Sequence, residues 1–302
     1  MRVTNNTMTN SIVRYLTSQN EALFERQTII ASGKKINKPS DDPIGMGKVL
    51  DYRQTIATIE QYQTNIKRGK TRLDVTETNL KLVDDLLQVV RAISQTEAAG
   101  TTESRQLAAG NVKNLFDQVL DTANSKLNRN YMFSGYQTKT APFSRDDAQA
   151  TTLDKFTVTY NGDAGDARFM VAENTEVTAA ADGEAIFHDL AGISIFNPMR
   201  DLIVALENDD AAAISAQQGL LDQAHTHLQD IRGANAPISY QLETTESHWQ
   251  NYKPKIEELL AKEETADITQ AIVELQSLEI AYQTTLATTA RIIQPGLLNF
   301  LK

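Results

Sequence analysis

The sequence predicts a mainly α-helical protein, a long antiparallel bundle of coiled-coil helices with a small β-containing insert. Glycine and proline are scarce among the 302 residues, at 14 and 7, and aromatic residues make up 6%. This composition is typical of long helices joined by few turns. Apolar residues also recur at every seventh position over much of the chain, which is a coiled-coil pattern. Alternation of apolar and polar residues in one segment indicates the insert.

A first helix is predicted between residues 7 and 32. Leu16, Leu23 and Ile30 are seven residues apart and, with Ile12, form a narrow apolar stripe. Gly33 follows as a C-terminal cap, because glycine readily adopts the left-handed conformation that ends many helices. The next residues, 34–42, have no periodicity and are expected to form an extended connector.

A second and longer helix is predicted to start at Pro43. Asp42 is suited to the N-cap, proline is favoured at the first helical position, and Asp41 adds favourable charge near the positive helix end. Six heptads without a proline then indicate about 50 residues, or about 75 Å, of helix. The repeating residues are Tyr52, Ile59, Ile66, Leu73, Leu80 and Leu87.

A third helix is expected to fold back on the second, because its apolar residues share one broad face. These residues are Leu107, Val112, Leu115, Phe116, Val119 and Leu127. The β-containing insert follows. Phe156, Val158 and Tyr160 alternate with polar residues, and Asn161-Gly162 is a strong turn signal. A lone hairpin is marginally stable, so partner strands are expected at 168–171 and 185–187.

Heptads return in the last third of the chain. Ile214, Leu221 and Leu228 begin a second long limb, and Ile268, Leu275 and Tyr282 form a final stripe that mirrors the first helix. We therefore expect five segments. They are an N-terminal assembly segment at 1–42, rod helices at 43–130, the β-containing outer domain at 131–198, a rod helix at 199–265 and a C-terminal assembly segment at 266–302.

Charge and residue usage exclude several functions. A formal net charge of -10 without a basic stripe disfavours nucleic acid and anionic membranes as partners. The absence of cysteine removes disulfides, thiolate metal sites and cysteine nucleophiles. His225 and His227 point apart on a helix, so we interpret them as solvated side chains rather than metal ligands. We predict no catalytic, cofactor-binding or metal-binding residues, and no enzyme.

Targeting segments are also not expected. The N-terminal residues lack the continuous apolar run of a cleaved secretion signal. Residues 280–300 carry little charge but contain too many polar side chains to span a bilayer. We therefore expect this last segment to contact protein rather than lipid.

Three stretches of the sequence resemble the flagellin family of bacterial flagellar axial proteins. They are Ala31–Pro43 with its Pro-Ser-Asp-Asp-Pro connector, Tyr131–Phe143 with its Phe-Ser-Gly block, and Glu279–Gln283 together with Leu297–Leu301. The connector and the Phe-Ser-Gly block are similar to those of the type 3 hook-associated proteins, which form the hook-filament junction. Flagellin itself typically has a connector closer to Ser-Ala-x-Asp-Asp-Ala-Ala-Gly.

This resemblance implies a flagellin-like fold and a structural subunit that is secreted through the flagellar type III apparatus without a cleaved signal. It implies self-association in a ring or helical layer, with the neighbouring hook-associated protein and flagellin as further partners. It also implies a cytoplasmic export chaperone that binds the C-terminal region, here 268–300. In the family the terminal segments form inner coiled coils and tend to be disordered before assembly.

The predicted assembly interface combines the two terminal stripes, whose apolar residues are buried when subunits join. It consists of Ile12, Leu16, Leu23, Ile30, Ile268, Leu275, Leu278, Tyr282, Leu286, Ile293, Leu297, Leu298 and Phe300. Periodicity alone also fits a self-contained bundle in which these residues pack within one chain. Two other functions stay open, a short flagellin that forms filaments by itself and a coiled-coil adaptor of a secretion system.

Overall fold

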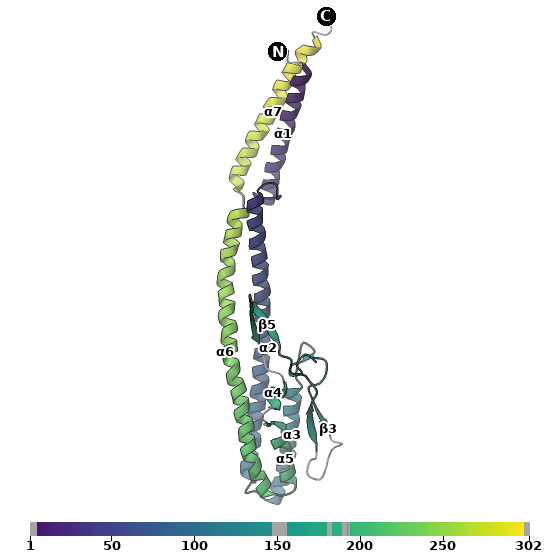
Figure 1. The fold of residues 1–302 in the computed structure, drawn as a ribbon, viewed down its shortest axis with the longest axis vertical. Helices are drawn as coiled ribbons and strands as arrows, with labels where there is room; N and C mark the ends of the chain where they lie inside the picture. The colour runs from purple at the N-terminus through teal and green to yellow at the C-terminus, as the bar shows by residue number, and fades with distance from the viewer. Residues whose placement is uncertain (1–4, 147–155, 180–182, 189–191, 193, 299–302) are drawn as a thin grey trace. The chain divides into compact units, whose positions relative to one another are not determined.

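The computed structural model describes residues 5–146, 156–179, 183–188, 192 and 194–298, and these residues are mainly helical, as predicted (Figure 1). The two longest helices, α2 and α6, have 55 and 54 residues. The helices are α1 (Asn5–Ser32), α2 (Pro43–Glu97), α3 (Thr102–Ala123), α4 (Gly183–Phe187), α5 (Phe196–Glu207), α6 (Ala211–Glu264) and α7 (Ile268–Leu298).

The predicted end of α1 and start of α2 are confirmed. Gly33 has a φ of 71°, and its amide donates to the Ile29 carbonyl at 2.8 Å, so glycine caps α1. Asp42 caps α2, because its Oδ1 accepts from the amides of Ile44 at 3.1 Å and Gly45 at 2.9 Å. Pro43 is the first residue of α2.

Asp41 has a structural role that the sequence pattern did not predict, in addition to its charge near the start of α2. Its Oδ2 accepts from the backbone amides of Lys38 at 2.8 Å and Asn37 at 3.0 Å, and thus folds the connector back on itself. These hydrogen bonds, that of Lys38 first, hold the pKa of the Asp41 carboxyl below its ordinary value. The side chain therefore shapes the connector through local hydrogen bonds.

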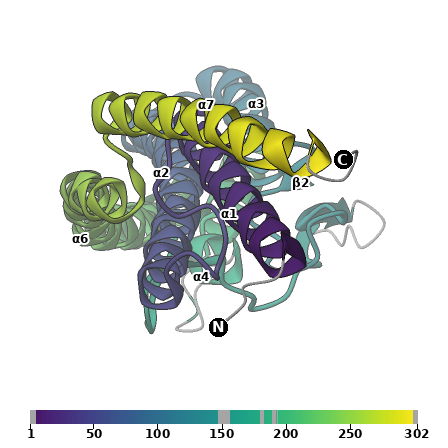
Figure 2. The ribbon, with the colours of Figure 1, turned by 90° about the horizontal axis from the view of Figure 1, so that it is seen from above.

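The chain divides into two compact units. Unit 1 comprises residues 1–59 and 251–302, and unit 2 comprises residues 60–250. Within unit 1, α1 and α7 run antiparallel and lie side by side (Figures 1 and 2). Unit 1 also contains the first part of α2 and the last part of α6.

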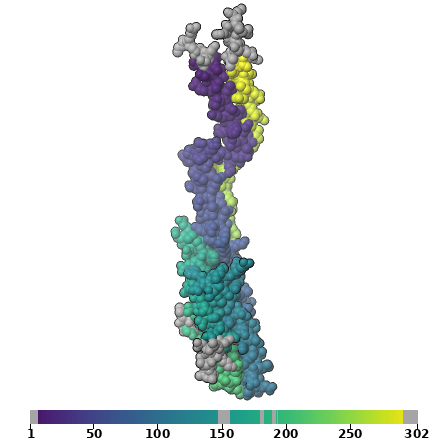
Figure 3. Space-filling model, turned by 90° about the vertical axis from the view of Figure 1, so that its right-hand side faces the viewer, coloured from purple at the N-terminus to yellow at the C-terminus, as the bar shows by residue number. Residues whose placement is uncertain are grey.

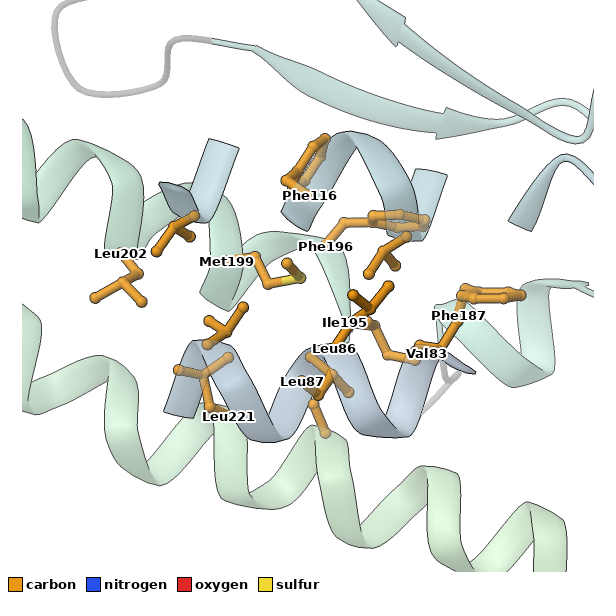
Figure 4. Packing of buried hydrophobic residues seen from close by; sticks show 14 of the residues in the cluster. Val83, Leu86, Leu87, Phe116, Phe187, Ile195, Phe196, Met199, Leu202 and Leu221 are labelled. Atoms are coloured by element: carbon orange, nitrogen blue, oxygen red, sulfur yellow. The ribbon is translucent and has the colours of Figure 1, made fainter. Parts of the chain in front are cut away.

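Unit 2 has a main hydrophobic core between α2, α3, α5 and α6 (Figure 4). The heptad residues Leu80, Leu87, Leu221 and Leu228 are fully buried there, as the repeat predicts. Aromatic rings complete the core with edge-to-face contacts. Phe116 and Phe196 have ring centroids 5.7 Å apart, and Phe143 and Phe187 have centroids 5.2 Å apart.

A second, smaller core lies under the hairpin of β5 (Arg168–Ala172) and β6 (Thr175–Thr178). Val171 and Val177 of the hairpin pack with Ile66 and Leu73 of α2 and with Leu242 of α6. The insert covers much of the face of unit 2 that Figure 3 displays. This hairpin is therefore part of the packing between α2 and α6.

Two side chains also hold β5 through its backbone. Asn65 Nδ2 donates to the Met170 carbonyl at 2.9 Å, and Trp249 Nε1 donates to the Val171 carbonyl at 2.8 Å. Asn65 belongs to α2 and Trp249 to α6. The strand thus connects the two helices through hydrogen bonds as well as apolar contacts.

The strand pairing of the insert differs in part from the prediction. Each of the three described sheets is an antiparallel pair, namely β1 (Lys126–Leu127) with β2 (Asn130–Tyr131), β3 (Phe143–Asp146) with β4 (Thr157–Tyr160), and β5 with β6. The strand expected at 168–171 is present but pairs with β6. Asn161-Gly162 follows β4 without joining it to a paired strand.

Other expectations of the insert and of α3 are wrong. Residues 185–187 lie in α4, because a short apolar run fits a buried helix as well as a strand. Leu107 is 73% exposed, since it precedes the buried Ala108 and is rotated by about 100° from it around the helix. Leu127 lies in β1, beyond the end of α3 at Ala123.

Candidate assembly interface

The predicted terminal stripes face each other in unit 1 without becoming a closed core. The residues Ile12, Leu16, Leu23, Ile30, Leu275, Leu278 and Tyr282 are half-buried. Ile268 and Leu286 are 37% and 42% exposed. Contact between α1 and α7 is visible in Figures 2 and 3. Two helices alone cannot enclose a stripe, and these residues therefore keep apolar surface for a further contact.

Four predicted interface residues cannot be placed in this way. Phe300 lies outside the described residues, as do the side chains of Ile293, Leu297 and Leu298. Their part in the interface stays a prediction.

The structure reveals a second apolar stripe on each terminal helix that the sequence analysis missed. On α1, Met8 and Tyr15 are seven residues apart and are 44% and 57% exposed. On α7, Val273 and Ile280 are also seven residues apart and are 61% and 65% exposed. In the sequence, the sign of this second stripe is another set of apolar residues seven positions apart beside the first heptad. Such a pattern is typical of a helix that contacts more than one neighbour. Phe24 of α1 is 72% exposed as well, but nine residues after Tyr15 it lies on the opposite side of the helix.

An ion pair between α1 and α7 adds little to their association. Arg26 Nε lies 3.2 Å from Glu274 Oε2, and the two side chains are 35% and 37% exposed. Solvent screening limits such a pair to about 0–1 kcal/mol. The ion pair instead favours one register of α1 relative to α7.

The connectors before α2 and after α6 are hydrogen-bonded to each other at the base of the terminal pair. The Lys35 amide donates to the Glu264 carbonyl at 2.8 Å, and the Ala266 amide donates to the Gly33 carbonyl at 3.0 Å. Ile36 is buried beside them, with 5% of its surface exposed. The two connectors thus form a short backbone bridge, which fixes where α1 and α7 begin their contact.

Glu264 is the charged centre of this base. Its Oε1 forms ion pairs with Lys34 Nζ and, at 2.6 Å, with Arg53 Nη2, while 8% of the residue is exposed. Burial raises the pKa of Glu264 and is the largest single cause, but the hydrogen bond from Lys34 and the charge of Arg53 together bring the pKa below its ordinary value. The carboxylate is therefore held ionised between two cations.

The histidine expectation is wrong in one respect. His225 and His227 are half-buried rather than solvated. His225 Nε2 lies 3.1 Å from Asp84 Oδ1, and His227 Nε2 lies 3.0 Å from the Ala185 carbonyl oxygen. Each ring thus has its own neighbour. Within the described ranges, no group of three or more potential ligands is placed to hold a metal ion.

The length and the composition of the helices bear on membrane insertion. Across the part of the chain that is described, none of them combines the length and the apolar character that crossing a bilayer requires.

The chain has a helical body with a β-containing insert, and its first and last helices, which are distant in the sequence, pair with each other. Residues 3–138 match the family described as the bacterial flagellin N-terminal helical region. A crystal structure of flagellar hook-associated protein 3 from Legionella pneumophila has the same fold. It superposes with a TM-score of 0.61 at 18% identity, over 70% of this chain and 97% of that one.

Among curated proteins, the chain is a homologue of flagellar hook-associated protein 3 of Escherichia coli, to which it is 25% identical over 201 residues. That match covers 66% of this chain and 60% of the relative, so the chain spans about three fifths of its length. Flagellin FlaB2 of Treponema pallidum is 25% identical over 237 residues, which are 70% of this chain and 80% of that protein. The resemblance drawn from the sequence motifs is confirmed.

Proposed function

We propose that this protein is a structural, non-catalytic subunit of the junction between hook and filament of a bacterial flagellum. The observation that supports this most directly is the second apolar stripe on α1 and α7, which no described residue covers. Burying such side chains against a neighbour removes their apolar surface from water. Each side chain of this size then stabilises the contact by about 1.5–3 kcal/mol. The matched relatives are named flagellar hook-associated protein 3, and this name supports a position at the junction rather than within the filament.

In this proposal the occupants of the stripes are the terminal helices of neighbouring axial subunits. The inner stripe, from Ile12 to Ile30 and from Ile268 to Phe300, holds α1 and α7 together. The outer stripe, with Tyr15 and Ile280, binds the next subunit. Copies of this chain, the neighbouring hook-associated protein and flagellin would each present a comparable surface. The subunit leaves the cell through the flagellar export apparatus and functions outside it.

A pair of matched variants of α7 tests this role. Val273→Asp combined with Ile280→Asp places charge in the outer stripe, whereas Gln276→Asp combined with Gln283→Asp adds the same charge at exposed polar positions. We expect the first variant to fold but to be lost from isolated flagella, and the second to be incorporated. Immunogold labelling at the hook end of the filament measures the outcome. Equal incorporation of both variants would contradict the proposal.

A short flagellin is the second candidate, because Flagellin FlaB2 also matches the chain, over 80% of that relative. The two roles predict different behaviour of the purified protein. A filament subunit should polymerise into long filaments when seeded, whereas a junction subunit should stop after a short zone. Negative-stain electron microscopy of seeded mixtures distinguishes them, and long filaments of this chain alone would favour flagellin.

Export adds a further expected partner. We propose that a cytoplasmic chaperone covers the C-terminal region between Ile268 and Phe300 until secretion, because its apolar stripes are exposed to water in the free chain. Deletion of residues 286–302 should abolish the complex in a co-purification assay, while deletion of the first 15 residues should leave it intact. A chaperone complex that survives the C-terminal deletion would argue against this assignment.

A further inference from the structure

A groove of about 440 Å³ lies between α2 and α6 in unit 2. Leu73 and Ala236 give it apolar contacts, and Asp74, Glu77 and Glu243 make it acidic. Arg232, the one cation that lines it, already binds Glu77 at 2.7 Å and Asp84 at 3.0 Å. The groove is therefore negatively charged and attracts a cationic group.

The groove lies where the seam of α6 becomes polar. Leu221, Leu228, Asn235 and Leu242 are spaced by seven residues, so Asn235 stands at a position that is otherwise apolar. The main core includes Leu228 and the smaller core includes Leu242. Asn235 thus lies between two hydrophobic cores, at a level where the packing of α2 against α6 is interrupted.

Two buried polar atoms at this groove have no hydrogen-bond partner in the described part of the chain. They are Asn235 Nδ2, on a residue that is 9% exposed, and Glu77 Oε2. Buried polar groups are nearly always paired in folded proteins. Nδ2 requires an acceptor and Oε2 requires a donor. An occupant that offers a carbonyl oxygen and a cationic N–H group satisfies both.

Arginine at the tip of a protruding turn fits these requirements. Its guanidinium can donate to the free oxygen of Glu77 and lie against the ring of Tyr240, which is 70% exposed. A backbone or side-chain carbonyl next to the arginine can accept from Asn235 Nδ2. A cation on the flank of a helix would not bring a carbonyl with it, because helical carbonyls bond within the helix.

The chain itself contains such a turn. Asn128 and Arg129 join β1 to β2 with φ values of 52° and 69°, which form a tight tip. Arg129 is exposed and has no described partner. From Thr122 to Ser144 the sequence has three basic residues and no acidic one, in contrast to the net charge of -10. Asn79 Nδ2 holds the base of this hairpin through Ser125 Oγ at 2.8 Å.

We infer that the groove binds the Asn128-Arg129 turn of a second copy of this chain. The inference rests on the proposed function, because it requires copies to lie next to each other in the flagellum. Groove and turn are different surfaces of one subunit, so the contact is heterologous. Repeated from copy to copy, it generates the ring or helical layer that a junction requires. It adds a contact in unit 2 to those of the terminal helices.

Disulfide cross-linking provides a direct test because the chain contains no cysteine. Asn128→Cys is combined with Ser239→Cys, at the lining of the groove, and flagella isolated from cells that express this variant are treated with a mild oxidant. A disulfide forms when the two Cα atoms are within about 7 Å. We expect a ladder of dimers and higher multimers on a non-reducing gel. Asn128→Cys with Ser215→Cys, outside the groove, should give none.

Charge reversal then tests whether the contact depends on the positive charge of Arg129 and the negative charge of the groove. Adding Arg129→Glu to the cysteine pair should reduce the ladder at least tenfold, and adding Asp74→Lys with Glu243→Lys to that variant should restore it. Circular dichroism of the purified variants confirms that they fold. If the chain is present in flagella but gives no ladder, the groove assignment is overturned and the proposed function stands. If the chain is absent from flagella, the proposed function fails and the groove contact fails with it.

Discussion

Arg232 of α6 joins two carboxylates that stand one heptad apart on α2. Its Nη1 lies 3.0 Å from Asp84 Oδ2, and its Nη2 lies 2.7 Å from Glu77 Oε1. Gln229 Nε2 also donates to Asp84 at 2.9 Å. Asp84 is 3% exposed, and a buried carboxylate without such partners would be costly inside the bundle. Because one guanidinium contacts both acids, a shift of α6 along α2 would break at least one pair.

Removing this cation should strongly destabilise unit 2. Arg232→Met retains much of the side-chain volume but leaves Asp84 buried without its ion pair, which costs about 3–5 kcal/mol. Urea unfolding followed by circular dichroism measures the loss. Asp84→Asn in the same chain should recover part of it, because the uncompensated charge is then gone. A loss below about 1 kcal/mol in Arg232→Met would show that the pair does not hold the seam.

The hydrogen bond from Trp249 to β5 should have a smaller and measurable effect. Trp249→Phe keeps an aromatic ring beside Tyr62, whose centroid is 5.5 Å away, but leaves the Val171 carbonyl without this donor. We expect a loss of about 1 kcal/mol in urea unfolding. Tyr240→Phe, at an exposed ring, is the control and should change stability by a few tenths of that. Equal losses of stability in the two variants would contradict the role assigned to the indole N–H.

Glycine substitutions should separate backbone strain from helix propensity. Gly135 has a φ of 65°, and a Cβ at this position would collide with the backbone and side chain of Asp163. Gly135→Ala should therefore prevent normal folding of the insert. Gly110, within α3, has no atom within 4 Å of such a Cβ, and Gly110→Ala should stabilise by about 0.5–1 kcal/mol. Thermal unfolding compares the two, and a stable Gly135→Ala protein would contradict the assigned crowding.

The ion pairs of Glu264 predict a particular dependence on pH. The pKa of Glu264 in the folded chain is lowered. The ion pairs of Glu264 therefore stabilise the fold fully above the ordinary carboxyl pKa of 4.5, and this stabilisation is lost as the pH falls through the pKa of the folded state. Glu264→Gln should lower the melting temperature at pH 7 and flatten its decline in acid. Glu258→Gln alters a pair that is 65% and 66% exposed and should have little effect at pH 7. Parallel pH profiles of wild type and Glu264→Gln would refute this role.

Local signals in the sequence predicted the helix ends and the heptad core well. Gly33 and Asp42 act through their own backbone neighbourhood, and Leu80 and Leu228 follow a repeat that is insensitive to the rest of the fold. Residues 185–187 were assigned to a strand because a short apolar run has no period of its own. In the structure Phe187 packs against Phe143 and Phe196, and contacts between residues so far apart in the sequence are not encoded in a local pattern.

The exposed apolar surface of the terminal helices was predicted less completely than the fold. Leu23 and Leu275 belong to the single apolar stripe predicted for each helix, whereas Val273 and Ile280 form a second stripe that this pattern does not include. Asn235 was overlooked for the opposite reason. A polar residue within a heptad looks like a gap in the pattern, and its unpaired amide became visible when Glu77 and the groove could be placed beside it.

Because α1 pairs with α7, the proposed assembly surface forms only after synthesis of the chain has reached α7. α1 leaves the ribosome early, but the helix that it packs against begins at Ile268. A chain that terminates or is cleaved anywhere before that residue has α1 without its neighbour and lacks both stripes of α7. If the terminal helices form the assembly surface as proposed, such broken chains are not incorporated, and incomplete products of translation are excluded without a separate proofreading protein.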